Sequence, residues 1–529
     1  MSVRQNCPHL DVFPSRQSTR LAMLVLSLSL AFLSGCSSSS NPCGATGIYN
    51  IASLGSSGTQ WAYEISGRII NSNGTYSPYA SAGVFSVNGN GGIIGGTDAF
   101  WGTITGGSYT MNNNGIGAVT LNISTNTGTK SLVWGITLGN PATTNSRGSF
   151  GVIENDSLVT SAGAAYQQNA AIVNTAPRAT YVFHTHTTAP GASITGAQNA
   201  VGLITFGAGT VTGNDDWVIG GGTGGQTLGF SGIFKTPSGG VGSLTFTDGL
   251  GLRTFDYFPI DANTLLLYET DAINKGGGVG RAEAQQSPTG GFTNASLSGG
   301  FAFLRRGDTS VSGAGGVSAA GQFVADGNGN ITSGSLDSVR DRTAQAGQKI
   351  SASTYSFASV SRINGRATAT LVSSGGNSVA AVLYLVSPAR AFFIVTNDPT
   401  VVEDGTADQQ STTSFTESSF IGTYALVMGG TVSGIPRARA GVVAADGHFN
   451  LVWSLIATSP AQSACTIGAY SVAPNGRVSS TLPLVSSNMI FYLISPNSAY
   501  VIQVDTGNQM AGGVVNQSHV PTPFIPGTF

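Results

Sequence analysis

Charged side chains are scarce in this sequence. Asp, Glu, Lys and Arg make up 9% of the 529 residues, against roughly 25% in an ordinary soluble domain. The 22 basic and 24 acidic residues give a formal net charge of −2, and the basic residues form no extended patch. Binding to nucleic acid needs such a patch to neutralise phosphates, so we expect no nucleic-acid partner.

Cysteine and histidine are scarce as well. Four cysteines are too few for a disulfide framework, and Cys43 and Cys465 lie so far apart in the chain that we expect no bond between them. Five histidines leave little capacity for general acid–base catalysis, and no nucleophile-elbow, zinc-protease or phosphate-loop motif occurs. We therefore expect a protein without enzymatic activity or cofactor, stabilised by burial of apolar surface.

The apolar run at residues 21–33, LAMLVLSLSLAFL, has 13 residues, and a helix needs about 20 to span a bilayer. It follows two arginines and closes on Leu-Ser-Gly-Cys, which ends at Cys36. This arrangement resembles the lipobox of bacterial lipoproteins and implies a signal peptide at 1–35, lipidation of Cys36 and a membrane-anchored mature chain. By the same resemblance, Ser37 in place of Asp implies the outer membrane. A plain secretory signal is the alternative.

Glycine, in contrast, is abundant, with 75 residues, and it reveals a repeat. The stretch FVADGNGNITSG begins at residue 323, and related stretches are FSVNGNGGII from 85, ITFGAGTVTG from 204 and VAADGHFN from 443. Their aligned glycines are separated by 118, 120 and 120 residues and are Gly89, Gly207, Gly327 and Gly447. A constant separation of this kind indicates tandem units.

The landmarks around these glycines divide the chain into domains. After the signal and a tether at 36–45, we expect β repeats at 46–168, 178–286, 298–410 and 419–517, and then a tail at 518–529. Turn residues every ten or so positions and strand-like alternation predict an all-β fold of four antiparallel domains, each with six to nine strands. We favour meander-type barrels, with sandwiches as the alternative. The pattern resembles tandem repeats of secreted bacterial lipoproteins, which implies location and repetition but no activity.

The stretch around Gly327 also resembles a calcium loop in part. Asp326, Asn328 and Asn330 alternate as the first ligands of such a loop do. The carboxylate is repeated at Asp446 in the fourth unit but not in the first two, where Asn88 and Phe206 take its place. The glycine is repeated, and it supplies the positive φ that a hairpin turn requires. We interpret these residues as a turn, with a weak calcium site at Asp326 as the alternative.

A second candidate metal site is His184 with His186. Alternate residues of a strand project to one face, so these imidazoles could share a transition metal if Asp215 or Asp216 supplied a third ligand. A polar strand face is the alternative interpretation. The pair Arg305-Arg306 and the run of Arg340 and Arg342 could meet an anionic partner. We interpret them as scattered surface arginines.

These observations together predict a lipid-anchored, non-enzymatic protein of the cell envelope or cell surface. It would act as a binding, adhesion or stalk module, with a polysaccharide or another envelope component as its partner. Two alternatives remain open. One is a glycan-directed hydrolase with a carboxylate pair in one unit, and the other is a carrier of a small apolar ligand in a barrel lumen.

Overall fold

The computed structural model describes residues 49–140, 148–155, 158–187, 197–220, 223–271, 278–309, 316–358, 364–376, 378–456, 463–482 and 487–517. The expected signal peptide, Cys36, the tether, Cys43 and the C-terminal tail lie outside these residues. Among the described residues, the structure contains no helix long and apolar enough to cross a bilayer. Residues Ala45–Phe529 form one compact unit.

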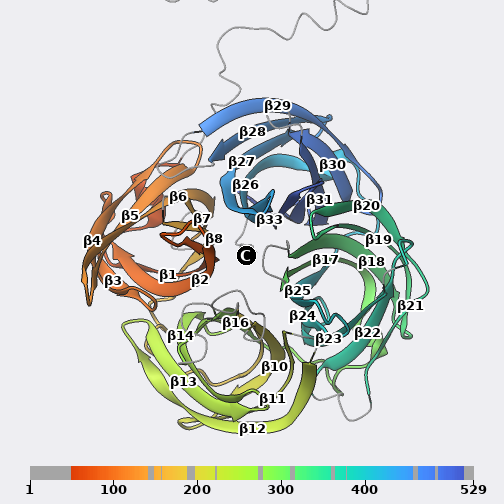
Figure 1. The fold of residues 1–529 in the computed structure, drawn as a ribbon, viewed down its shortest axis with the longest axis horizontal. Helices are drawn as coiled ribbons and strands as arrows, with labels where there is room; N and C mark the ends of the chain where they lie inside the picture. The colour runs from red at the N-terminus through yellow and green to blue at the C-terminus, as the bar shows by residue number, and fades with distance from the viewer. Residues whose placement is uncertain are drawn as a thin grey trace, which may run out of the picture. The chain divides into compact units, whose positions relative to one another are not determined.

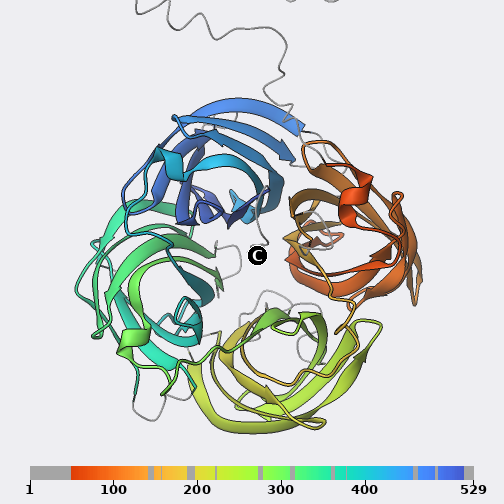
Figure 2. The same cartoon turned by 180° about the vertical axis from the view of Figure 1, so that it is seen from behind.

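The first barrel follows a short 3-10 helix, η1 (Ile51–Leu54). Its strands are β1 (Thr59–Ile70), β2 (Tyr76–Val87), β3 (Gly92–Asp98), β4 (Gly102–Met111), β5 (Ile116–Thr125), β6 (Gly128–Asn140), β7 (Ser149–Asn155) and β8 (Val159–Gln167). Each strand pairs with the next in antiparallel register, and β8 pairs with β1 to close the sheet (Figures 1 and 2).

The second barrel repeats this plan. Its strands are β9 (Thr180–Thr187), β10 (Gln198–Phe206), β11 (Thr210–Ile219), β12 (Thr223–Ser238), β13 (Val241–Asp248), β14 (Gly251–Asp261), β15 (Thr264–Glu269) and β16 (Gly278–Ala284). The sheet closes where β16 pairs with β9.

The third barrel follows η3 (Asn294–Ser296) and has one additional strand. Its strands are β17 (Ser298–Thr309), β18 (Val317–Asp326), β19 (Asn330–Arg340), β20 (Thr343–Ile350), β21 (Ser353–Ser356), β22 (Arg366–Val372), β23 (Ser378–Ser387), β24 (Arg390–Val395) and β25 (Val401–Gln409). Eight of them close a circuit, because β18 pairs with β19 and β17 pairs with β25. The ninth, β20, pairs with β19 at the sheet edge.

The fourth barrel follows η5 (Glu417–Ser419). Its strands are β26 (Ile421–Val432), β27 (Ile435–Asp446), β28 (Asn450–Ile456), β29 (Ser463–Val472), β30 (Arg477–Leu482), β31 (Ser487–Ser495), β32 (Ser498–Asp505) and β33 (Asn508–Asn516), and β33 pairs with β26. The prediction of an all-β chain of tandem antiparallel barrels is therefore confirmed, and barrels replace the sandwich alternative.

Each lumen is packed with apolar side chains from alternate strand positions. In the first barrel the rings of Tyr63 and Trp134 meet edge to face, with centroids 4.8 Å apart. In the second, Phe230 and Phe246 stack at 4.4 Å. Aromatic side chains bury large apolar areas, so the lumens serve as separate cores.

Some strands are also buried on their outer face, because the barrels contact one another. The contacts run in cyclic order: β2 of the first barrel meets β16 of the second, β10 meets β23 of the third, β18 meets β33 of the fourth, and β27 meets β7 of the first. One apolar cluster joins outer-face residues of three barrels, among them Ala164, Phe258 and Val427. Small residues such as alanine at these positions let the sheets approach closely.

A glutamine at the end of each barrel connects it to the next barrel in this cycle. Its side-chain amide nitrogen donates to two backbone carbonyls there, one of them at a turn that contains glycine. The four sets are Gln168 to Gly240 and Pro259 (3.3 and 2.7 Å), Gln285 to Asn364 and Leu385 (3.0 and 2.8 Å), Gln410 to Asn475 and Leu493 (3.1 and 2.8 Å), and Gln517 to Asn114 and Leu138 (3.3 and 2.7 Å). The last set returns from the fourth barrel to the first. We call these four side chains the interbarrel glutamines.

The turn that receives each interbarrel glutamine requires glycine for two reasons. Gly115, Gly240, Gly365 and Gly476 all have positive φ, between +69° and +85°. A Cβ at any of them would lie within 2.9 Å of the glutamine side chain. Glycine tolerates this backbone conformation and leaves room for the amide.

Candidate functional site

The two predicted histidines lie on the same face of β9, as expected, and contact one carboxylate. His184 Nδ1 is 3.3 Å from Asp404 Oδ2, and His186 Nδ1 is 3.0 Å from Asp404 Oδ1. Asn199 also donates to Asp404, at 3.1 Å. Although burial alone would raise the pKa of Asp404, the two histidines hold it well below its ordinary value. The aspartate comes from the third barrel, so this cluster joins two barrels.

Neither aspartate that the sequence suggested as a third metal ligand reaches these histidines. Asp216 accepts two hydrogen bonds of 2.7 Å from Arg366 and one of 2.8 Å from Tyr384, both in the third barrel. Asp215 points to the opposite face of β11, where burial and the nearby Asp248 raise its pKa to about 8. Over the described residues, no group of three or more His, Cys, Asp or Glu side chains is arranged to hold a metal ion.

The candidate calcium ligands form a turn. Asp326 Oδ1 accepts from the backbone N–H groups of Asn328 and Asn330 at 2.7 and 3.0 Å, and Oδ2 accepts from the Asn330 side chain at 2.7 Å. Hydrogen bonds from Asn330 and Asn328 lower the pKa of Asp326. Asp446 makes the same contacts in the fourth barrel. The carboxylate oxygens are thus used within their own turns.

The aligned glycines of these turns behave alike in three barrels. Gly89, Gly327 and Gly447 have φ of +80°, +76° and +73°. Gly207 differs from the expectation, since the positive φ in its turn falls two residues later, at Gly209 with +81°. Phe206 provides no carboxylate or amide oxygen to accept the turn N–H groups. A backbone hydrogen bond from Gly207 N to Thr210 O, at 2.8 Å, closes this turn instead.

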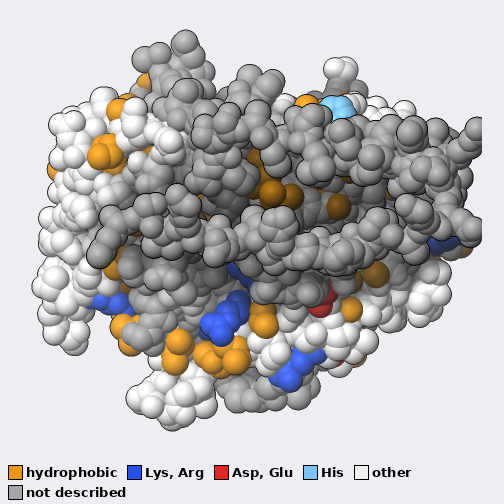
Figure 3. Space-filling model, turned by 90° about the horizontal axis from the view of Figure 1, so that it is seen from above, with side chains coloured by type: hydrophobic (Ala, Val, Ile, Leu, Met, Phe, Trp, Pro, Cys, Tyr) orange, Lys and Arg blue, Asp and Glu red, His pale blue; other side chains and the backbone are white. Residues whose placement is uncertain are grey.

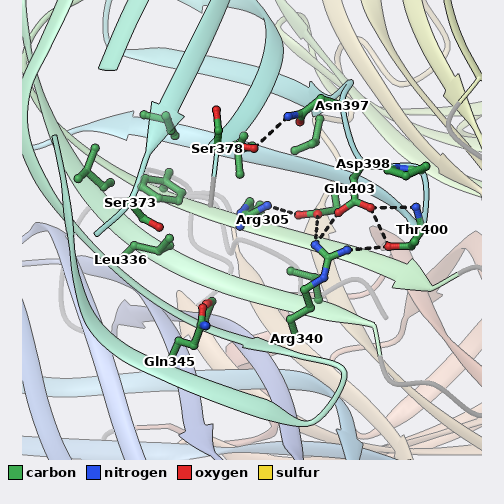
Figure 4. A pocket seen from close by; sticks show the side chains of 18 residues that line it. Arg305, Leu336, Arg340, Gln345, Ser373, Ser378, Asn397, Asp398, Thr400 and Glu403 are labelled. Carbon is green, nitrogen blue, oxygen red and sulfur yellow. Dashed lines mark hydrogen bonds and ion pairs between the residues drawn. The ribbon is translucent and has the colours of Figure 1, made fainter. Parts of the chain in front are cut away.

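A further candidate site is a cavity of about 320 Å³ in the third barrel (Figure 4). Most of its lining side chains come from strands β17–β20 and β22–β25. Polar lining residues are Arg305, Ser338, Arg340, Gln345, Ser373, Ser378, Asn397, Asp398, Thr400 and Glu403. Apolar lining residues are Phe303, Val317, Leu336, Ile350, Leu371, Val379, Val395 and Pro399.

Two arginines and two carboxylates form a linked cluster at one end of this cavity. Arg305 donates to Glu403 Oε2, and Arg340 pairs with Asp398 while its Nη1 lies 3.8 Å from Glu403 Oε1. Thr400 N donates to Asp398 at 2.9 Å. Figure 4 shows these side chains gathered together, away from Leu336 and Ser373.

The two carboxylates differ in environment. Glu403 is fully buried, and burial raises its pKa although Arg305 counteracts this. Burial would also raise the pKa of Asp398, but hydrogen bonds from Arg340 and Thr400 lower it overall. The interpretation of Arg305 and Arg306 as surface residues is wrong: both are buried, because β17 is covered on both faces.

The wall of the third barrel is irregular in its strand pairing next to the cavity. Strand β19 pairs over most of its length with β20 and only through Asn330 and Ile331 with the four-residue β21. Between β20 and the β22 end of the wall there is one bridge, Ile350 to Ser373. Gln345 and Ile350 of β20 line the cavity, which therefore lies beside this irregular part of the wall.

No protein-family model matches the chain, and no curated protein matches it. The assignment of a site therefore depends on the geometry described above.

Proposed function

We propose that this protein is a lipid-anchored, non-enzymatic binding protein of the cell envelope, with a neutral, hydroxyl-rich partner such as a polysaccharide. The observation that carries the proposal is the cavity of the third barrel, which combines hydrogen-bonding side chains with apolar ones. The anchoring part of the proposal comes from the lipobox-like sequence that ends at Cys36.

The outer surface supports a neutral partner. Exposed hydroxyl side chains lie on strands of all four barrels, including Thr103, Thr105, Thr212, Thr247, Thr354, Thr368, Ser471 and Thr481. On the face drawn in Figure 3, the described surface carries few charged side chains. Hydroxyls can hydrogen-bond a saccharide without the salt dependence of ionic contacts.

The contacts between barrels favour a compact binding module over a stalk. The interbarrel glutamines and the shared apolar clusters bury the sides of the repeats against one another. Repeated surfaces on one such unit would gain avidity for a polymer even where each contact is weak.

Glycan hydrolysis is the second candidate, because Glu403 and Asp398 face one cavity with pKa values shifted in opposite directions. Glycosidases use two carboxyl groups in different protonation states. Binding is preferred because Arg305 and Arg340 already pair with these carboxylates, which leaves neither ready to transfer a proton.

The test uses the mature lipoprotein in a sugar-free detergent. We expect wild-type protein to incorporate labelled palmitate and Cys36→Ala protein to incorporate none. We also expect wild-type protein to sediment with purified neutral envelope polysaccharide without shortening the polysaccharide. Label on the Cys36→Ala variant would contradict the anchor. A lack of binding to every neutral polysaccharide would contradict the binding role, and release of shorter glycans that Glu403→Gln abolishes would establish the hydrolase instead.

A further inference from the structure

The cavity of the third barrel contains a buried acceptor that the protein itself leaves open. Glu403 has no exposed surface. Its Oε2 accepts from Arg305, but Oε1 accepts no hydrogen bond from any described residue, and the nearest cation, Arg340 Nη1, is 3.8 Å away. A buried carboxylate oxygen without a donor is unfavourable, so a ligand hydroxyl that reached it would gain a strong, charge-assisted hydrogen bond.

The second barrel shows what a fully satisfied buried glutamate looks like in this chain. Glu269 Oε1 accepts from Arg253 at 2.7 Å, and its Oε2 accepts from Thr187 at 2.6 Å. The hydrogen-bond donors to both oxygens come from the same barrel as Glu269. The two buried glutamates therefore differ, because only Glu269 has a hydrogen-bond donor at each carboxylate oxygen.

The charges of the cavity indicate a neutral ligand. The two guanidinium groups of Arg305 and Arg340 balance the two carboxylates of Glu403 and Asp398. A charged ligand would leave one charge uncompensated in a partly desolvated site, which is costly. A hydroxyl group can donate to the free oxygen and accept from a guanidinium without changing this balance.

The remaining lining residues and the size of the cavity narrow the choice of ligand class further. Leu336, Ile350, Leu371 and Val395 provide apolar contact away from the charged cluster. A volume of about 320 Å³ is at the lower end of the range of roughly 300–1,000 Å³ for small-molecule pockets. A sugar ring has hydroxyls at its edge and C–H groups on its face, and it matches both kinds of lining.

We propose that the cavity of the third barrel binds a single neutral sugar residue, with one ligand hydroxyl donating to Glu403 Oε1 and another accepting from Arg340. This deepens the proposed function and rests on it, because it locates polysaccharide recognition in one of the four repeats. Leu371, on β22, contacts the opposite side of the ring.

The experiment measures binding of a panel of neutral monosaccharides and disaccharides to the mature lipoprotein by saturation-transfer NMR and calorimetry in a sugar-free detergent. We expect at least one neutral sugar to bind in the millimolar range or tighter, and its uronic-acid and amino-sugar counterparts to bind at least tenfold more weakly. Leu371→Trp, which fills the cavity, should weaken binding at least tenfold. Thr368→Trp on the exposed face of the same strand should change it less than twofold.

A second variant covers the case in which Leu371→Trp does not fold. Glu403→Gln keeps the shape of the side chain but removes its charge, and it should also weaken the sugar at least tenfold while the thermal midpoint shows a folded protein. Polysaccharide binding that is unchanged in both folded variants would overturn the cavity proposal and leave the proposed function standing. If the wild type binds neither the sugars nor the polysaccharide, both the cavity proposal and the proposed function are wrong. If it binds a long-chain alcohol and no sugar, the cavity belongs to a carrier of apolar ligands instead.

Discussion

Glu64 on β1 is a single buried side chain that makes the stability of the folded protein depend on pH. It is 3% exposed and lies near Arg281 and Glu283 of the second barrel. Arg390 of the third barrel contacts Glu283 at 2.7 Å and Asp408 at 2.7 Å. In a chain with few charges, several of them are concentrated at these interfaces. Burial raises the pKa of Glu64 to about 7, an effect that Arg281 opposes and Glu283 increases.

This shift predicts how Glu64 affects stability as a function of pH. Because its pKa is higher in the folded state than in the unfolded chain, its contribution is most favourable below about pH 4.3. The contribution is lost as pH rises through about 7, since the charged form must then be buried. We expect Glu64→Gln to be more stable than wild type at pH 8, by no more than about 3 kcal/mol, with the difference disappearing near pH 4. Urea unfolding of both proteins at several pH values measures this difference, and a Glu64→Gln protein that is less stable at pH 8 would contradict it.

Some individual residues could be predicted from the sequence, and others could not. The turn glycines Gly89, Gly327 and Gly447 were predictable because only local geometry determines a positive φ. Strand alternation predicted that His184 and His186 would contact one group. It could not predict that this group is Asp404, because Asp404 lies 218 positions from His186 in the sequence. Arg305 and Glu403 were missed as site residues. The run FAFLRRG places adjacent arginines on opposite faces of one strand, and this was the available signal.

At the scale of elements, the interbarrel glutamines are the most regular feature of the fold. Each follows the end of a final strand, and three of the four occur in a Gln-Gln pair in the sequence. The pairs were visible as a repeat, but the carbonyls that they bind belong to the next unit and could not be assigned without the fold. The same holds for the cavity, because its lining residues come from strands that are far apart in the sequence.

The pair Gln285-Gln286 provides a matched test of these contacts. Gln285 donates to two carbonyls of the third barrel, whereas the side chain of Gln286 is exposed. We expect Gln285→Leu to lower the free energy of unfolding by about 1–3 kcal/mol, because carbonyls covered by the interface lose their donor. Gln286→Leu should change it by less than about 0.5 kcal/mol. Equal effects of the two substitutions in urea unfolding would show that the amide contact contributes little.

Strand composition also distinguishes the inner and outer parts of each barrel. Strands at the contacts between barrels, such as β23 and β26, have nearly continuous apolar or small residues, and strands away from them alternate. Continuous apolar runs are typical of strands buried on both faces. The sequence therefore carried a signal that the repeats pack together, but it did not indicate which strands meet.

At the scale of the whole molecule, four repeats of one plan have different contents. All four lumens contain aromatic side chains, and the third barrel also carries a cavity with two arginines and two carboxylates. Because the contacts are cyclic, the third barrel packs against both the second and the fourth. A ligand bound in the third barrel would therefore lie beside repeats that stabilise this barrel and add exposed surface. The number of repeats and their strand plan followed from the glycine period, and their mutual contacts came only from the structure.

The four barrels form a closed cycle, in which the fourth barrel packs against the first. A Cβ at Gly135 of β6 would lie 3.3 Å from Ile456 Cγ2 of β28, although these residues are far apart in the sequence. Disulfide formation tests this arrangement in protein with Gly135→Cys and Ile456→Cys, in a background with Cys43→Ser and Cys465→Ser. We predict that mild oxidation joins the two new cysteines within a single chain, as shown by mass spectrometry of the linked peptides, whereas Gly135→Cys with Thr368→Cys gives no such link. A native chain that forms no intramolecular link between positions 135 and 456 would contradict the closed arrangement.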